Sequence, residues 1–147
     1  MLRELVTAFA IVAICLVIHV FAIVLMAEWL LRRRDAALGD DLSTVGYALL
    51  LLAVFSAIIL LHVAQTGIWA GLYYERSLFP DYETSLYFSL VSYTTIGYGD
   101  VVLPQRWRLL GGIEGVSGTL LCGLSTAFIF AIINAMFQMR LRQRSGR

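Results

Sequence analysis

Residues 84–100 read TSLYFSLVSYTTIGYGD, and this stretch decides how the rest of the chain is arranged. Its first part predicts a helix of about three turns, because Pro80 sets the preceding turn and Asp81 is a favourable helix N-cap. The helical signal stops at Thr95, where glycines and a β-branched isoleucine follow. The apolar part of the helix, 86–91, is too short to cross a bilayer. The segment is therefore expected to enter the membrane and return to the same side.

Three apolar stretches lie around this segment, and each has the roughly 20 residues that a membrane-spanning helix needs. They are residues 5–27, residues 45–64 with a helical continuation through QTGIWAGLYY, and residues 109–139. The chain of 147 residues is 60% hydrophobic, whereas soluble domains are about 45–50% apolar. These features predict an all-α membrane protein with three transmembrane helices and a re-entrant pore helix.

Charge and composition exclude several classes of function. The net charge of +1 gives no reason to expect a nucleic-acid partner, and membrane lipid is the expected environment. The sequence holds no arrangement of polar residues with catalytic spacing, so we expect neither an enzyme nor a small-molecule substrate or cofactor. The first apolar stretch could be mistaken for a signal peptide. Its length, the missing A-x-A site and the arginines at 32–34 favour a retained helix.

The arginines also predict the orientation in the membrane. Seven of the eleven basic residues follow the first and last apolar stretches, at 32–34 and at 140, 142, 144 and 147. Basic residues are concentrated on the cytoplasmic side. We therefore expect the N-terminus outside, the C-terminus in the cytoplasm and the re-entrant segment entering from outside. Irregular backbone at membrane depth must line a wet pathway or a packed interior.

The segment TTIGYGD, residues 94–100, resembles the signature of potassium channels, with isoleucine where valine is commonest. The resemblance includes the layout of outer helix, pore helix, filter and inner helix over about residues 45–140. It does not include the first apolar stretch, which lacks the regularly spaced arginines of a voltage sensor. That first helix is expected either to pack outside the pore or to hold a tetramer together.

The resemblance implies a selectivity filter in which backbone carbonyls replace the water around a potassium ion. Gly97 and Gly99 are expected in the left-handed conformation that turns successive carbonyls to one side. One chain supplies one filter segment, so the resemblance implies a homotetramer. The implied K⁺ ligands are the carbonyls of Thr95, Ile96, Gly97 and Tyr98, with Gly99 completing the filter.

Several neighbouring residues are expected to support the filter. The family's aromatic cuff corresponds here to Tyr87 and Phe88, although Phe88 has no hydrogen-bond donor, so Ser92 is the alternative partner for Tyr98. The glutamate that some relatives place behind the filter is Val91 here, which leaves Tyr87 as a partner for Asp100. The expected support residues are Thr94, Asp100, Tyr87, Phe88 and Ser92.

Glu114 is a carboxyl group inside a predicted span, and such residues are expensive and commonly functional. We expect it to form a buried polar cluster with Gln65 or His62 that braces the filter from behind. The alternatives are a single hydrogen bond from Glu114 to the pore helix, or a protonated carboxyl that faces lipid. By family position, Gly118 is the candidate gating hinge. Gly111, Gly112 and Gly115 are expected to pack against the pore helix, and His19 is expected to be structural.

The sequence thus divides into an extra N-terminal transmembrane helix (1–34), a cytoplasmic linker (35–44), a pore domain (45–140) and a basic cytoplasmic tail (141–147). The expected function is passive, potassium-selective conduction across a plasma or inner membrane. Two alternatives remain at this point. One is a weakly selective cation channel, and the other is a non-conducting scaffold or accessory subunit.

Overall fold

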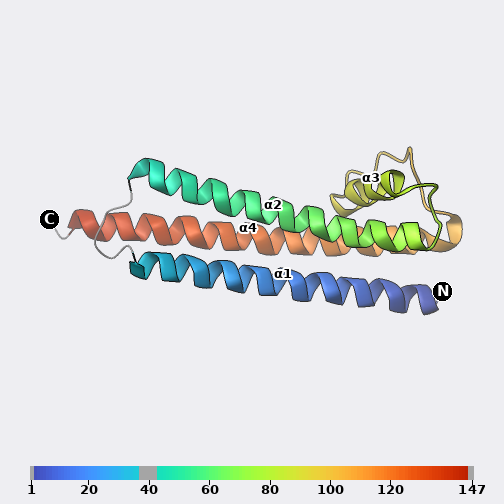
Figure 1. Ribbon diagram of the computed structural model, residues 1–147, viewed down its shortest axis with the longest axis horizontal. Helices are drawn as coiled ribbons and strands as arrows, with labels where there is room; N and C mark the ends of the chain where they lie inside the picture. The colour runs from blue at the N-terminus through green and yellow to red at the C-terminus, as the bar shows by residue number, and fades with distance from the viewer. Residues whose placement is uncertain (1, 37–42, 146–147) are drawn as a thin grey trace.

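The computed structural model describes residues 2–36 and 43–145 of the chain. In order, the elements are α1 (Leu2–Ala36), α2 (Thr44–Glu75), α3 (Tyr82–Tyr93), the 3₁₀ turn η1 (Gln105–Trp107) and α4 (Arg108–Ser145). The three long helices lie side by side along the molecule, and the short α3 packs near one end of them (Figure 1). The described residues contain no β-strand. The protein is therefore an all-α membrane protein, as its composition predicts.

Each of the three long helices is long and apolar enough to cross a membrane. The apolar spans are Arg3–Arg32, Thr44–Glu75 and Gln105–Leu141, so all three predicted spans are confirmed and the helices extend beyond them. Most of the predicted linker, residues 37–42, lies outside the described residues. The predicted tail begins as a continuation of α4, which runs to Ser145.

The re-entrant helix begins and ends where local chemistry predicts. The Asp81 side chain accepts a hydrogen bond from the Thr84 amide at 2.7 Å, which satisfies one of the free donors at a helix start. This bond holds the pKa of the Asp81 carboxyl below its ordinary value. The helix ends at Tyr93 with Thr94 as its C-cap. The predicted cap and the predicted end of the helical signal are both confirmed.

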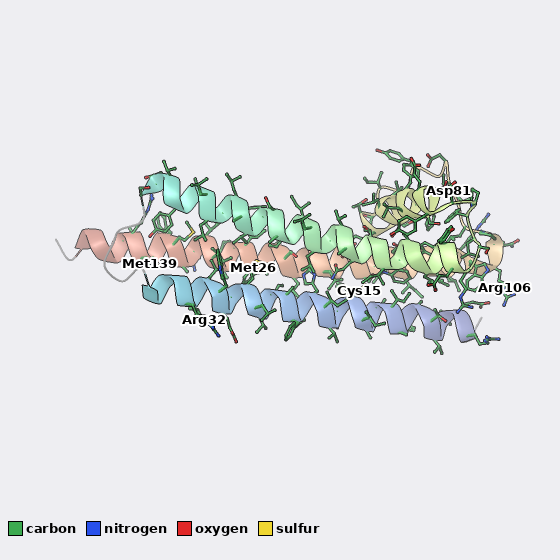
Figure 2. The ribbon with its side chains drawn as sticks, viewed as in Figure 1. Cys15, Met26, Arg32, Asp81, Arg106 and Met139 are labelled. Atoms are coloured by element: carbon green, nitrogen blue, oxygen red, sulfur yellow. The ribbon has the colours of Figure 1, made fainter. Side chains whose placement is uncertain are left out.

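Close packing is concentrated at the α3 end of the molecule. The aromatic side chains Tyr73, Phe79 and Phe88 meet there, with the rings of Tyr73 and Phe88 5.3 Å apart at 82°. Such edge-to-face contacts stabilise beyond the buried area alone. Figure 2 shows Cys15 on the side of α1 that faces the other helices, with Asp81 at the start of α3. The side chains of the bundle are therefore most closely packed around α3.

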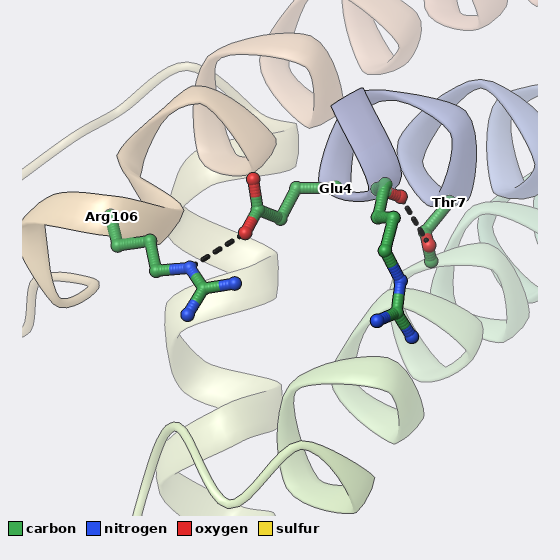
Figure 3. A network of polar contacts seen from close by, with 4 residues as sticks. Glu4, Thr7 and Arg106 are labelled. Atoms are coloured by element: carbon green, nitrogen blue, oxygen red, sulfur yellow. Dashed lines mark hydrogen bonds and ion pairs between the residues drawn. The ribbon is translucent and has the colours of Figure 1, made fainter. Parts of the chain in front are cut away.

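The helix α1 is also attached at this end of the molecule. The Arg106 Nε donates to the Glu4 carboxylate at 2.7 Å, and the Glu4 side chain is only 6% exposed (Figure 3). The start of α1 is thereby joined to η1, next to the loop that leaves the re-entrant segment. The N-terminal end of α1 and α3 lie at one end of the molecule, and the C-terminal end of α4 lies at the other (Figure 1). This relative placement of the chain ends agrees with the predicted topology.

Candidate functional site

The candidate site is the loop of residues 94–100, which follows α3 directly. Its backbone alternates in hand: φ is +61° at Thr95, +59° at Gly97 and +79° at Gly99, whereas Ile96 and Tyr98 keep negative φ. Glycine enters the left-handed region at little cost, so Gly97 and Gly99 occupy it as predicted. Thr95 was not expected there, because a β-branched residue rarely adopts positive φ.

The amides of Thr95, Ile96 and Gly97 point back towards α3. The amides of Ile96 and Gly97 both donate to the Val91 carbonyl, at 3.0 and 3.2 Å, and the Thr95 amide donates to the Ser92 carbonyl at 3.0 Å. An alternating backbone of this kind turns successive N–H groups to one side. Over the described chain, no backbone amide donates to a carbonyl of residues 95–99. These carbonyls are therefore available to coordinate a cation.

The loop is open on the side away from α3. All residues from 94 to 100 are exposed in the single chain, and the side chains of Ile96 and Tyr98 are 54% and 70% exposed. A groove of about 510 Å³ runs beside the loop, lined by Thr95 and Gly97 and by α4 residues that include Gly112, Val116 and Leu120. Irregular backbone at membrane depth must be covered by protein or face water. One chain alone does not cover this loop.

The expected partner of Asp100 is confirmed. The Tyr87 hydroxyl donates to Asp100 Oδ2 at 2.6 Å. This hydrogen bond holds the pKa of Asp100 below its ordinary value and raises the pKa of Tyr87. At the start of the loop, Thr94 is held by a hydrogen bond from its hydroxyl to the Leu90 carbonyl at 2.6 Å. The loop is thus fixed at both ends by α3.

Phe88 and Ser92 are placed differently from the expected cuff. Phe88 is buried towards α2 and α4, where its ring contacts Tyr73 and Phe79. Ser92 supports the loop through its carbonyl, which accepts from Thr95. No hydrogen bond joins the Ser92 and Tyr98 side chains within the described chain. The alternative partner that the sequence predicts for Tyr98 is therefore not found.

Glu114 is fully buried, but its predicted partners are wrong. The Tyr73 hydroxyl donates to Glu114 Oε2 at 2.7 Å, and Glu114 Oε1 is hydrogen-bonded to Ser89 on α3. Neither Gln65 nor His62 reaches the carboxyl group. The contact with α3 is close to the alternative of a single hydrogen bond to the pore helix, with Tyr73 added. The sequence does not predict Tyr73 and Ser89 as partners of Glu114, because a hydroxyl in an apolar run does not indicate which way it faces.

A count of hydrogens indicates the charge of Glu114. The Ser89 hydroxyl has one proton, and that proton is donated to the Thr66 carbonyl at 2.8 Å. The contact between Ser89 and Glu114 then needs a proton from the carboxyl group. A buried, unpaired carboxylate is also costly. We therefore expect Glu114 to be a neutral acid, because in that form it accepts from Tyr73 and can donate to Ser89, so that every group is satisfied.

Gln65 and His62 meet a different residue, the last residue of α3. The Tyr93 hydroxyl donates to Gln65 Oε1 at 2.6 Å, and His62 Nδ1 lies 2.9 Å from the same hydroxyl. His19 of α1 joins this cluster through Gln65 at 3.2 Å and Ser125 at 3.1 Å. The predicted polar brace therefore consists of two separate clusters, and both hold α3.

The glycines of α4 make room for α3. An added Cβ would lie 3.1 Å from the Phe88 ring at Gly111 and 3.1 Å from the Ser92 carbonyl at Gly115, so both pack as predicted. At Gly118 the Cβ would lie only 2.1 Å from the Tyr93 carbonyl oxygen. Gly112 has nothing within 4 Å, so its predicted packing role is wrong.

These features define a membrane-spanning protein in which the short helix α3 leads into a backbone loop suited to cations. A family model described as "Ion channel" matches residues 47–135. The chain therefore belongs to this ion-channel family, and α1 lies outside the matched region. No curated protein and no solved structure matches the chain.

Proposed function

We propose that the protein is a potassium-selective channel that conducts K⁺ passively as a homotetramer. Residues 95–99 form the selectivity filter, and the carbonyls of Thr95, Ile96, Gly97 and Tyr98 replace the ion's hydration shell. The single observation that carries this proposal is the alternating backbone of the loop, with its amides turned to α3 and its carbonyls left available. The sequence TTIGYGD, which resembles the potassium-channel signature, supports K⁺ as the ion.

The tetramer follows from the same loop. A ring of carbonyls around one ion needs several copies of a segment that each chain holds once, and the resembled family uses four. The exposed loop and the groove beside it give each chain a surface that a neighbouring copy covers. A head-to-tail contact of this kind closes into a ring. The four α3 helices then direct their C-terminal ends, with partial negative charge, towards the cavity below the filter.

Gating is assigned to α4. By family position, Gly118 remains the candidate hinge, although its contact with Tyr93 gives it a packing role as well. Membrane lipid surrounds the tetramer in a plasma or inner membrane, with the N-terminus outside and the arginine-rich C-terminal end in the cytoplasm. This orientation is supported by the distribution of basic residues.

The test is rubidium uptake into liposomes that contain the purified protein, with empty liposomes as the control. We expect rubidium uptake that barium blocks and with which external sodium does not compete. Equal uptake of sodium would contradict potassium selectivity and favour a weakly selective cation channel. No uptake above that of empty liposomes would contradict conduction and favour an accessory subunit.

A further inference from the structure

Five side chains, drawn from α1, α2, α3 and α4, form a closed ring of hydrogen bonds. Going round the ring, they are Gln65, His19, Ser125, His62 and Tyr93, and the successive contacts measure 3.2, 3.1, 3.0, 2.9 and finally 2.6 Å back to Gln65. His19 and Gln65 are fully buried, and Tyr93 and Ser125 are nearly so. The chain has two histidines, and both lie in this ring, with ring centres 5.2 Å apart.

The Gln65 amide sets the direction of the ring. Its Nε2 donates to the Cys15 carbonyl at 3.0 Å, so the amide nitrogen faces α1 and the amide oxygen faces Tyr93. The second hydrogen on Nε2 is then donated to His19 Nδ1. The Tyr93 hydroxyl donates its single proton to Gln65 Oε1 at 2.6 Å.

Each remaining step has one proton to donate. Because Tyr93 has given its proton to Gln65, His62 Nδ1 must donate to the Tyr93 oxygen. His62 Nε2 accepts from Ser125, and the Ser125 oxygen in turn accepts from His19 Nε2. The ring therefore closes with every group satisfied when both histidines are neutral. It requires opposite tautomers, with the proton on Nδ1 in His62 and on Nε2 in His19.

The ring holds the residue from which the proposed filter begins. Tyr93 is the last residue of α3, and its carbonyl lies against Gly118 of α4 without room for a Cβ. We propose that His19 is a positioning residue for the filter, through which α1 fixes Tyr93 and hence the first carbonyls of the loop. This inference rests on the proposed function. It gives α1, which lies outside the family match, a part in conduction.

The direction of the hydrogen bonds in the ring also predicts which histidine opens the ring when it takes up a proton. A proton added to His19 Nδ1 would face the Gln65 amide hydrogen, so the ring would have to open. A proton added to His62 Nε2 would face the Ser125 oxygen, which can accept it on its second lone pair once the Ser125 hydroxyl proton turns away. The other titratable groups on the packed helices are Cys15 of α1, Tyr93 of α3, and Glu114 and Cys122 of α4. Glu114 acts electrostatically on Cys15, and both cysteines and Glu114 act on Tyr93.

The first test reads the tautomers by ¹⁵N NMR of histidine-labelled protein at neutral pH. With two histidines in the chain, His62→Gln assigns the remaining signal to His19. We expect one Nδ1–H and one Nε2–H imidazole, assigned to His62 and His19 respectively. Two identical tautomers, or a charged imidazole at neutral pH, would overturn the ring. This measurement needs no ion flow, so it is independent of whether the protein conducts.

The second test removes one hydroxyl from each end of α3. Tyr93→Phe opens the ring, whereas Tyr82→Phe removes a weak exposed contact to the Gly67 carbonyl at 3.4 Å and is the matched control. We expect rubidium uptake relative to sodium to fall about tenfold in Tyr93→Phe, as the loss of one buried hydrogen bond predicts, and to be unchanged in Tyr82→Phe. Unchanged selectivity in Tyr93→Phe would overturn the positioning role. Absence of uptake in the wild type would instead contradict the proposed function.

The third test is the pH profile of uptake. We expect wild-type uptake to fall on acidification, because a proton on His19 opens the ring. The neutral amide in His19→Gln can still accept and donate, so we expect this variant to lose the acid response. The titratable control Glu114→Gln should keep it. An acid response that persists in His19→Gln, or that disappears in Glu114→Gln, would overturn the assignment to His19.

Discussion

Three residues of the glycine loop share a left-handed backbone, although only two of them are glycines. Gly97 and Gly99 could be placed from the sequence, because glycine is the residue that adopts positive φ without strain. Thr95 could not, since a β-branched residue takes this conformation only when its surroundings impose it. Here the Thr95 amide is bonded to the Ser92 carbonyl, and that contact depends on where α3 ends.

The variant Gly97→Ala tests the backbone of the loop. Within its own chain an added Cβ at Gly97 meets nothing within 4 Å, so the strain within the chain comes from φ. The left-handed conformation costs an alanine about 1–2 kcal/mol, which favours a relaxed loop. We expect rubidium uptake to be lost while the protein elutes from size exclusion as the wild type does. Gly71→Ala, equally open but in a helix, should conduct normally; conduction by Gly97→Ala would contradict the role of the alternating backbone.

Replacing Glu114 tests whether the buried carboxyl is neutral. In Glu114→Gln the amide oxygen can accept from Tyr73 and the amide nitrogen can donate to Ser89, which is the pattern of the protonated acid. We expect unchanged thermal stability. Glu114→Leu leaves the Tyr73 hydroxyl without an acceptor and should lower the free energy of unfolding by about 1–3 kcal/mol. Thermal unfolding in detergent compares the two, and a Gln variant as unstable as the Leu variant would indicate a charged carboxylate.

At the scale of elements, the contact between α3 and α4 depends on small residues. Gly118 lies where a Cβ would be 2.1 Å from a backbone oxygen of α3, an atom that cannot move aside as a side chain can. Gly71 of α2 lies outside the groove beside the loop, and an added Cβ there meets nothing within 4 Å. The two glycines therefore form a matched pair, one required by packing and one free.

We expect Gly118→Ala to separate α3 from α4 and to lower the free energy of unfolding by about 1–3 kcal/mol, the usual cost of overpacking. Gly71→Ala should be neutral or slightly stabilising, because alanine is the better helix former. Thermal unfolding midpoints of the two variants measure the difference. Equal midpoints would show that Gly118 is not needed for packing and would leave the hinge as its only role.

The elements themselves were largely predictable, and their rotations were not. Long apolar stretches identified the three spans, and Asp81 identified the start of α3, because both signals are local. The sequence predicts that Gln65 or His62 meets Glu114, because all three are polar groups inside spans, and Gln65 and His62 share one helix face near the middle of the membrane. In the structure Gln65 and His62 contact Tyr93 instead. The helix α1 lies beside α2, and its His19 contacts Gln65. No signal within α2 alone could have revealed that neighbour.

At the scale of the whole molecule, α1 is attached to the rest of the protein at two positions along its length. Its start is joined to η1 by Glu4 and Arg106, and its middle is joined to the other helices through His19. Elsewhere the long helices expose large apolar side chains such as Val17, Leu60 and Phe130. These surfaces suit lipid or neighbouring copies, and under the proposed function neighbouring copies cover the open loop.

The assembly state is therefore a direct prediction. We expect the mass of the purified protein in detergent, after subtraction of bound detergent, to equal four chains of 16.4 kDa. The expected tetramer follows from the need for a closed ring of carbonyls around the ion. A stable monomer or dimer that retains ion flux would contradict it.

The most direct test of the central claim is the reversal potential of the purified protein in a planar bilayer with potassium on one side and sodium on the other. If the carbonyls of residues 95–98 select potassium, the current reverses close to the potassium equilibrium potential. A current that reverses near zero would contradict the account, because it would mean that the loop passes both ions alike.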